Sequence, residues 1–218
     1  MELDWLDRLD LRWLMLWLRS PVSEIPQKTL GRLEVLSLSA RLDRPITTDR
    51  IPRITSLSID QRNIDGHWSA ADSLESVELG RTSVVRLGVF EHCARLISLV
   101  VDVVGQARSA EWVFDSATDL PIEYLKIEGP VLRTLEGVER LPRLQRLIVN
   151  PHRTPKPPPR IDLRPLASCR QIELVGLDLC GVMTHSEMLD ELPALQRVTT
   201  SPQGLEPMPD SRPWLLVR

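Results

Sequence analysis

The stretch Leu33-Glu34-Val35-Leu36-Ser37-Leu38 decides the fold, because it spaces three leucines in the pattern L-x-x-L-x-L. Leu36 and Leu38 are two residues apart, so on a β-strand their side chains point to the same side. A single short strand cannot bury such an apolar side without a partner. The stretch therefore predicts a strand that packs beside further copies of itself.

The same pattern recurs along the whole chain. The copies are Leu11/Leu14/Leu16, Leu33/Leu36/Leu38, Ile54/Leu57/Ile59, Leu74/Val77/Leu79, Leu96/Leu99/Val101, Ile122/Leu125/Ile127, Leu144/Leu147/Val149 and the weaker Cys169/Ile172/Leu174 and Leu195/Val198/Thr200. They are about 23 residues apart on average, within the range of known repeat architectures. Copies in order at near-constant spacing predict a solenoid whose turns stack around one continuous core.

On these copies, the sequence resembles the leucine-rich-repeat (LRR) family over nearly its full length. The resemblance implies an α/β solenoid, a curved horseshoe arc with a parallel concave β-sheet and about nine repeats of about 23 residues. The family places a buried Asn or Cys three residues after the third apolar position. Here those positions hold Arg19, Arg41, Arg62, Thr82, Val104, Pro130, His152, Leu177 and Gln203. We therefore expect an irregular bacterial type of repeat without the Asn ladder.

The segments between the strands are expected to return over the convex side. Two of them predict short helices, because apolar residues recur there at the three-residue steps of a helical face. These sets are Val89, Phe90, Cys93 and Leu96, and Leu132, Leu135, Val138 and Leu141. Thr184-His185-Ser186-Glu187 predicts a capping box that begins a further helix.

The chain is expected to form a single LRR domain over residues 1–218. Residues 1–32 are assigned to an N-terminal cap and the first repeat, 33–200 to the repeats, and 201–218 to a Pro-rich tail or cap. The apolar end of this tail, 214–217, is expected to fold back over the last turn. The Pro-rich segment 151–159 predicts extended structure, either a stiff surface bulge or a ligand for a proline-recognising partner.

Three of the six tryptophans, Trp5, Trp13 and Trp17, lie near the N-terminus together with Leu6 and Leu9. One interpretation is a cap that covers the first turn of the solenoid. The alternative places Trp13 and Trp17 on the open inner face as anchors for a partner, because they alternate with Leu14 and Leu16. The sequence leaves both interpretations open.

The resemblance implies that the concave sheet is the binding surface. Strand positions outside the core carry seven acids, namely Glu34, Asp60, Glu75, Glu78, Asp102, Glu123 and Glu128, besides Tyr124 and Lys126. In the last three repeats Arg146, Arg170 and Arg197 accompany Glu173. An acidic face favours a cationic partner protein. The alternative is that these charges only keep the face soluble.

Other classes of function find little support in the sequence. The net charge of −3 offers no basic excess for nucleic acid, and no apolar run is long enough to span a membrane. His67, His92, His152 and His185 are scattered over different repeats, and no short-spaced cysteine pair suggests a metal site or disulfide. Cys93 and Cys169 fit core positions, and Cys180 has no evident base beside it. A cysteine-dependent enzyme is the least favoured hypothesis.

These observations predict a cytoplasmic, non-enzymatic scaffold that binds a protein and needs no metal, cofactor or small-molecule substrate. One specific hypothesis is a neutralising, immunity or inhibitor protein that captures a basic partner. The alternative is a structural adaptor subunit within a larger assembly.

Overall fold

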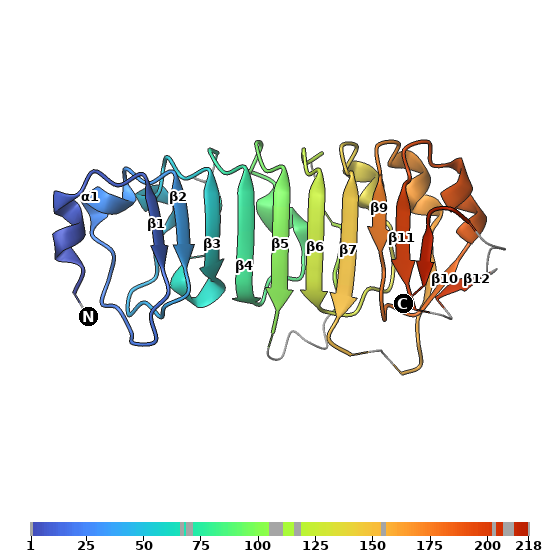
Figure 1. Ribbon diagram of the computed structural model, residues 1–218, viewed down its shortest axis with the longest axis horizontal. Coiled ribbons are helices and arrows are strands. Elements are labelled where there is room, and N and C mark those ends of the chain that lie inside the picture. The colour runs from blue at the N-terminus through green and yellow to red at the C-terminus, as the bar shows by residue number, and fades with distance from the viewer. Residues whose placement is uncertain are drawn as a thin grey trace.

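The computed structural model describes residues 2–65, 68, 72–104, 111–115, 119–153, 156–201, 204–206 and 212–217. Its main feature is a parallel sheet of ten strands in the described part of the chain (Figure 1). The strands are β1 (Trp13–Leu16), β2 (Val35–Leu38), β3 (Ser56–Asp60), β4 (Ser76–Thr82), β5 (Ser98–Val103), β6 (Tyr124–Gly129), β7 (Arg146–Pro151), β9 (Leu174–Gly176), β11 (Arg197–Thr200) and β13 (Leu215–Val217). They follow one another in chain order, as a solenoid requires.

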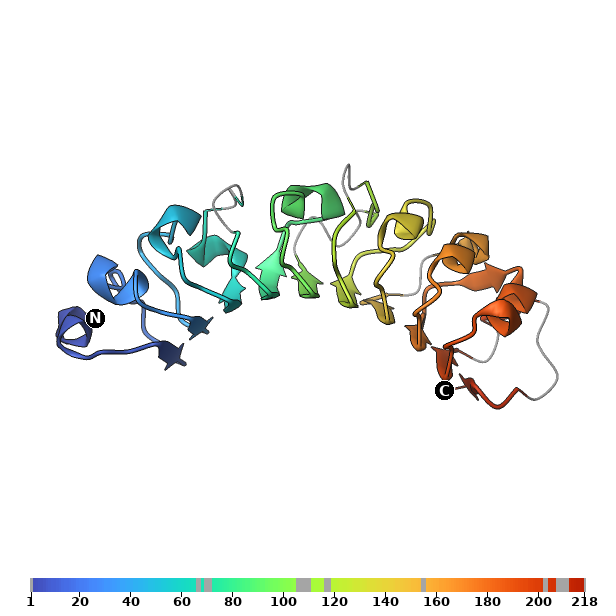
Figure 2. The same cartoon turned by 90° about the horizontal axis from the view of Figure 1, so that it is seen from above.

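The sheet forms the concave side of an arc, and the connecting segments cover its convex side (Figure 2). The 3₁₀ helix η1 (Asp4–Arg8) precedes β1. The connections contain α1 (Gln27–Leu30) and the 3₁₀ helices η2 (Thr48–Arg50), η3 (Gln61–Asn63), η5 (Leu87–Phe90), η7 (Val138–Arg140), η8 (Arg164–Ser168) and η9 (Ser186–Glu191). A second sheet of three parallel strands, β8 (Arg160–Asp162), β10 (Val182–Thr184) and β12 (Leu205–Glu206), lies near the C-terminal end. These elements give the curved solenoid that the sequence predicted.

The helices are shorter than the apolar spacing suggested. In residues 87–96 and 132–141 the only helical elements are the single 3₁₀ turns η5 and η7. A three-residue step also fits a 3₁₀ turn, in which side chains i and i+3 lie above one another. The predicted capping box is wrong, because Thr184 ends β10 and its hydroxyl donates to the carbonyl oxygen of Ile161. His185 takes the N-cap position in a left-handed conformation instead.

The core consists of three rows of apolar side chains that run across the strands. The second to eighth repeats each contribute one member to every row, as parallel register requires, and the ninth contributes Val198 to the second row. The first row contains Leu33, Ile54, Leu74, Leu96, Ile122, Leu144 and Ile172; the second Leu36, Leu57, Val77, Leu99, Leu125, Leu147, Val175 and Val198; the third Leu38, Ile59, Leu79, Val101, Ile127, Val149 and Leu177. None of these side chains is more than 3% exposed.

The eighth repeat is shifted by three residues from its predicted position. Val175 pairs with both Leu147 and Val198, so the buried triad is Ile172/Val175/Leu177 and not Cys169/Ile172/Leu174. Leu174 lies on the concave side instead, and Cys169 is buried next to η8. The apolar C-terminal segment covers the last turn as a strand, because β13 continues the sheet beside β11.

Three repeats contain a buried polar group at or near the ladder position of the family. Asn63 is fully buried; its Oδ1 accepts from the Leu42 amide at 2.8 Å and its Nδ2 donates to the Ala40 carbonyl at 2.6 Å. In the corrected register Cys180 lies three residues after Leu177, and its Sγ is 3.3 Å from the Val149 carbonyl oxygen. Thr82 is buried beside Gln61 of the preceding turn. Each of these groups joins adjacent turns, so the ladder is partly replaced.

Candidate binding surface

The concave face follows from the alternation of side chains along each strand. Residues between the core positions point away from the core, and parallel register aligns them in rows across the sheet. One row contains Trp13, Val35, Ser56, Ser76, Ser98, Tyr124, Arg146, Leu174 and Arg197. The next contains Met15, Ser37, Ser58, Glu78, Val100, Lys126, Ile148, Gly176 and Thr199. We call this surface the concave face.

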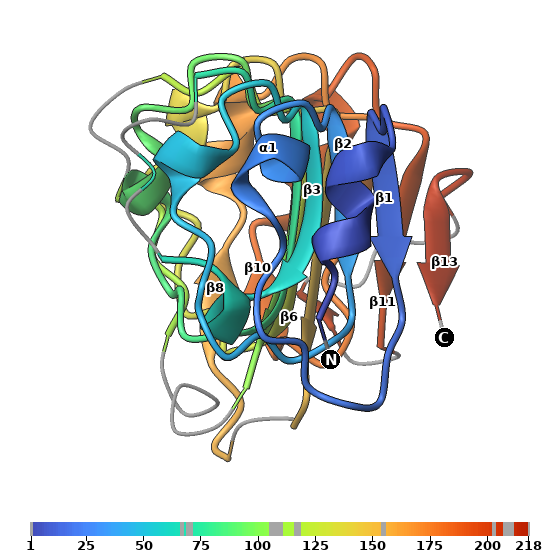
Figure 3. The ribbon, with the colours of Figure 1, turned by 90° about the vertical axis from the view of Figure 1, so that its left-hand side faces the viewer.

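The N-terminal end of the concave face is apolar and open to solvent. Trp13 is 72% exposed, Met15 is 62% exposed, and Trp17, just after β1, is 75% exposed. The end-on view shows η1 beside α1, and Leu6 of η1 is buried (Figure 3). Leu3 and Leu6 thus contribute to the core at this end, whereas Trp13 and Trp17 take the inner-face positions of the alternative interpretation.

Small side chains occupy the face between β1 and Glu78. Ser37, Ser56, Ser58 and Ser76 align there in adjacent strands, with Val35 beside them. A partner can approach the backbone more closely over serines than over the tryptophans. The side chains of this region are therefore shorter than the exposed tryptophans on and just after β1 and the acidic side chains further along the sheet.

Four of the seven predicted acids, Asp60, Glu78, Asp102 and Glu128, lie within strands of the concave face. Lys126 Nζ is 2.9 Å from the Glu128 carboxylate, and this hydrogen bond, with the nearby acids, raises the pKa of Lys126. Arg62 contacts Asp60 at 3.0 Å, and His152 Nε2 is 3.5 Å from Asp102. Glu78 accepts a hydrogen bond from the Ser58 hydroxyl at 3.2 Å.

The other three acids lie at the edge where the chain enters the strands. Glu34, Glu75 and Glu123 each stand one residue before β2, β4 and β6. Arg12 pairs with Glu34 at 3.1 Å and Arg95 pairs with Glu75. A shallow hollow at this edge is lined by Asp10, Arg12, Arg32, Glu34, Arg53, Thr55, Ser73 and Arg95. This edge is a mixed ionic surface, so the acidic character is concentrated on the strands β3 to β6.

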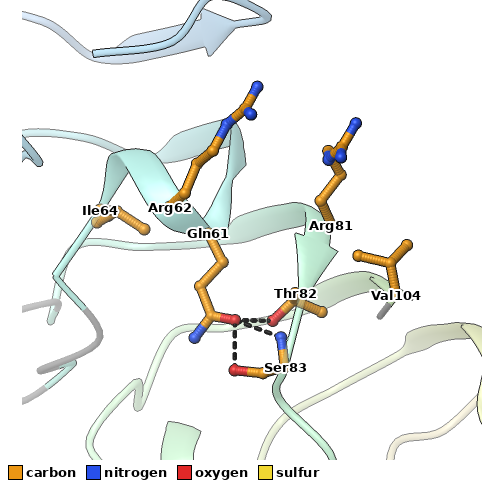
Figure 4. A pocket seen from close by; sticks show the side chains of 7 residues that line it. All are labelled: Gln61, Arg62, Ile64, Arg81, Thr82, Ser83 and Val104. Atoms are coloured by element: carbon orange, nitrogen blue, oxygen red, sulfur yellow. Dashed lines mark hydrogen bonds between the residues drawn. The ribbon is translucent and has the colours of Figure 1, made fainter. Parts of the chain in front are cut away.

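A second hollow lies at the opposite edge, below β3 and β4 (Figure 4). Gln61 Oε1 accepts hydrogen bonds there from the Thr82 hydroxyl at 2.7 Å and from Ser83. The side chains of Arg62 and Arg81 extend away from these hydrogen bonds in the same direction. The arrangement ties two turns together and places two guanidinium groups beside the acidic strands.

The C-terminal part of the face has the opposite charge. Arg146 and Arg197 lie in the same row as Tyr124 and Leu174. Arg170 precedes β9 and is not a strand residue, and Glu173 stands at the edge directly before β9. The face therefore changes along the arc from apolar at β1 to acidic in the middle and basic near β7 and β11.

Reactive groups are not gathered on this surface. Cys93, Cys169 and Cys180 are free and buried, and burial raises their pKa values to about 12, about 11 and about 12. Thiols of this kind are largely protonated at neutral pH and react slowly. Within the described ranges, no group of three His, Cys, Asp or Glu side chains is arranged to hold a metal ion. His67 lies outside the described residues.

No protein-family model matches the sequence, and the search of curated proteins finds no relative. Among solved structures, internalin C2 of Listeria monocytogenes is similar at 15% identity over 81% of this chain and 84% of that chain, with a TM-score of 0.52. Internalin F of the same organism shares 13% identity over 88% and 74% of the two chains, with a TM-score of 0.41. The first of these likenesses and the ten-stranded parallel sheet define the fold as a leucine-rich-repeat solenoid.

In the part of the chain that the structure describes, we find no helix of the length and apolarity needed to cross a bilayer.

Proposed function

We propose that this chain is a non-enzymatic scaffold that binds a cationic protein on its concave face. The observation that carries the proposal is the open face itself: three large apolar side chains are exposed on and just after β1, next to four acids on β3 to β6. Soluble monomers rarely expose large apolar side chains next to one another. Where such side chains are exposed, they often anchor an interface with a partner. Neighbouring acids select for positive charge and accelerate encounter.

The acidic middle of the face retains negative charge despite its ion pairs. Lys126 and Arg62 each contact one carboxylate, and His152 is a cation only when protonated. Among the described residues, Glu78 contacts a serine hydroxyl but forms no ion pair. Two acids, Glu78 and Asp102, which no lysine or arginine contacts among the described residues, therefore remain for cationic side chains of a partner.

Two biological roles fit such a face. A neutralising or inhibitory protein would cover a basic partner and release it slowly, whereas an adaptor would join several subunits of one assembly. The single continuous face favours the first role, because one partner can span the apolar and acidic regions together. A reducing compartment such as the cytoplasm suits the three free cysteines.

The test is a capture experiment with the purified protein and a Glu78→Lys/Asp102→Lys variant. Its matched control is Glu91→Lys/Glu136→Lys, which makes the same change in net charge next to η5 and η7 on the convex side. Circular dichroism checks that all three proteins are folded. We expect basic proteins to be captured by the parent and the control but lost by the concave variant.

Equal capture by both variants would contradict the concave acidic site. Loss in both variants would mean that only the net charge of the molecule matters. Capture of neutral or acidic proteins that is unchanged by either variant would remove the charge argument altogether.

A further inference from the structure

We propose that the low part of the concave face between Trp13 and Glu78 holds one amphipathic, basic α-helix of the partner. This inference rests on the proposed function and specifies the partner's structure. We call the region the N-terminal trough: Trp13, Met15 and Trp17 form its first wall, Ser37, Ser56, Ser58 and Ser76 its floor, and Asp60 and Glu78 its second wall. The walls differ in chemistry, and that difference defines the occupant.

The dimensions of the trough match a helix. In the middle row of the face, Met15 and Glu78 lie on β1 and β4, three strand spacings apart, which corresponds to about 14 Å. An α-helix with its side chains is about 10–12 Å wide. A single strand would leave the trough half empty, and a bulkier fold would rest on the tryptophans without reaching the serines.

The first wall matches one apolar stripe of such a helix. Trp13 and Trp17 are four residues apart on an extended chain, a distance of about 13 Å. Apolar side chains at positions i, i+4 and i+7 of a helix extend over about 10 Å. Two helical turns therefore cover Trp13, Met15 and Trp17 together. Of the residues that the structure describes, these three have the most exposed large apolar side chains.

The second wall selects the charge of the opposite stripe. Glu78 projects from β4, accepts a hydrogen bond from the Ser58 hydroxyl and forms no ion pair among the described residues, with Lys126 as an electrostatic neighbour. Asp60 has Arg62 at one oxygen. Lysine or arginine side chains along the polar side of the helix reach these carboxylates, while an acidic helix is repelled. The geometry and the charge thus specify an amphipathic helix with leucine-like residues on one side and cations on the other.

The experiment uses an 18-residue Leu/Lys peptide whose leucines follow helical i, i+3, i+4, i+7 spacing. A scrambled peptide of equal composition removes the amphipathic pattern, and an analogue with Glu for Lys reverses its charge. The proteins are the parent, Trp13→Ser/Trp17→Ser, Glu78→Gln, and the control Trp5→Ser, whose exposed indole lies on η1 away from the sheet. Because Trp68, Trp112 and Trp214 are buried, iodide quenching reports the three N-terminal tryptophans.

We expect the Leu/Lys peptide to bind the parent and to protect tryptophan from iodide. The double tryptophan variant should lose about 30-fold in affinity, the size of a hot-spot truncation, and Glu78→Gln a smaller factor. Trp5→Ser should bind as the parent does. The scrambled and acidic peptides should bind at least about tenfold more weakly.

Several outcomes would overturn the proposal. They are a parent affinity weaker than about 1 mM, equal binding of the scrambled peptide, and equal loss in Trp5→Ser. A parent dimer that the double tryptophan variant converts to a monomer would show that a second copy fills the trough. If the double variant still captures basic proteins in a Glu78- and Asp102-dependent way, the helix inference fails while the proposed function stands.

Discussion

At the residue scale, Asn63 shows how one buried polar side chain holds two turns of the solenoid together. Its side-chain oxygen accepts from the Leu42 N–H, and its side-chain nitrogen donates to the Ala40 carbonyl. Both backbone groups belong to the preceding turn. We expect Asn63→Ala to lower the free energy of unfolding by about 3 kcal/mol, because both backbone groups lose their partner in a dry site. Urea denaturation measures the change. Ser37→Ala, on the concave face, is the control and should change stability by less than about 0.5 kcal/mol; a similar loss in both would contradict this role.

Asp162 provides a pH-dependent test at the same scale. Hydrogen bonds from Arg164 lower the pKa of Asp162 from 3.8 to about 2, with His185 adding a smaller effect. Because the pKa is lower in the folded chain, the contribution to stability is complete above the unfolded pKa and is lost as the pH falls from 3.8 to about 2. Carboxyl-carbon NMR titration should show a midpoint near this low value.

The variant Arg164→Ala isolates the cause of that shift. It should return the midpoint of Asp162 toward 3.8, whereas Arg170→Ala, which removes an exposed arginine elsewhere, should leave it unchanged. A midpoint that stays low in Arg164→Ala would assign the shift to other groups.

At the scale of the element, the strands β1 to β7 and β11 were predictable from the repeats, whereas β9 was misplaced and most of the connections were not predicted. Every strand from β1 to β7 begins within a predicted L-x-x-L-x-L copy, because burial on one side imposes a strict period of two. The eighth copy was misplaced because Ile172-x-Leu174 and Val175-x-Leu177 both satisfy that period. Only pairing with Leu147 distinguishes them. Because of the same ambiguity in register, Cys180 was not recognised as the residue at the ladder position of the eighth repeat.

The strand β13 shows how the last element depends on its neighbour. Trp214 is buried directly before β13, and its carbonyl accepts from the Val198 amide at 2.6 Å. We expect Trp214→Ala to lower the free energy of local unfolding of the last turn by about 3 kcal/mol. Hydrogen exchange in β11 and β13 should therefore be faster. Exchange in β3 to β6 should be unchanged, since turns of a solenoid contact only adjacent turns.

Trp5→Ala is the matched control for that measurement, because Trp5 is exposed at the other end of the arc. It should leave exchange in β11 and β13 at the parent rate. Uniform acceleration over all strands in Trp214→Ala would instead indicate that the solenoid unfolds as one cooperative unit.

At the scale of the whole molecule, the sequence identified which charges lie on or beside the strands but not how they are neutralised. Arg12 and Arg95 belong to the turns next to Glu34 and Glu75, so their ion pairs depend on the stacking of adjacent repeats. Strand alternation offered the inner side for Trp13 and Trp17 as one of two interpretations. It could not show that both remain uncovered, since their exposure depends on the path of residues 2–12.

Long-range electrostatics provides the prediction for the whole arc. For a basic protein captured in the experiment above, the association rate should fall when salt is raised from about 0.05 M to about 0.5 M, because screening shortens the reach of Glu78 and Asp102. Stopped-flow or surface-based kinetics measures the rate. In Glu78→Lys/Asp102→Lys the salt dependence should vanish or change sign. A parent rate that is independent of salt would exclude electrostatic steering.

The alternation of core and face residues also determines how this molecule tolerates change. Substitutions on the concave face do not alter the three core rows, so most of them should shift stability by no more than about 0.5 kcal/mol. The residues of the concave face can therefore change during evolution, or be randomised in a combinatorial library, without loss of the solenoid fold. The similarity of its fold to that of internalin C2 at 15% identity shows how little sequence that frame prescribes.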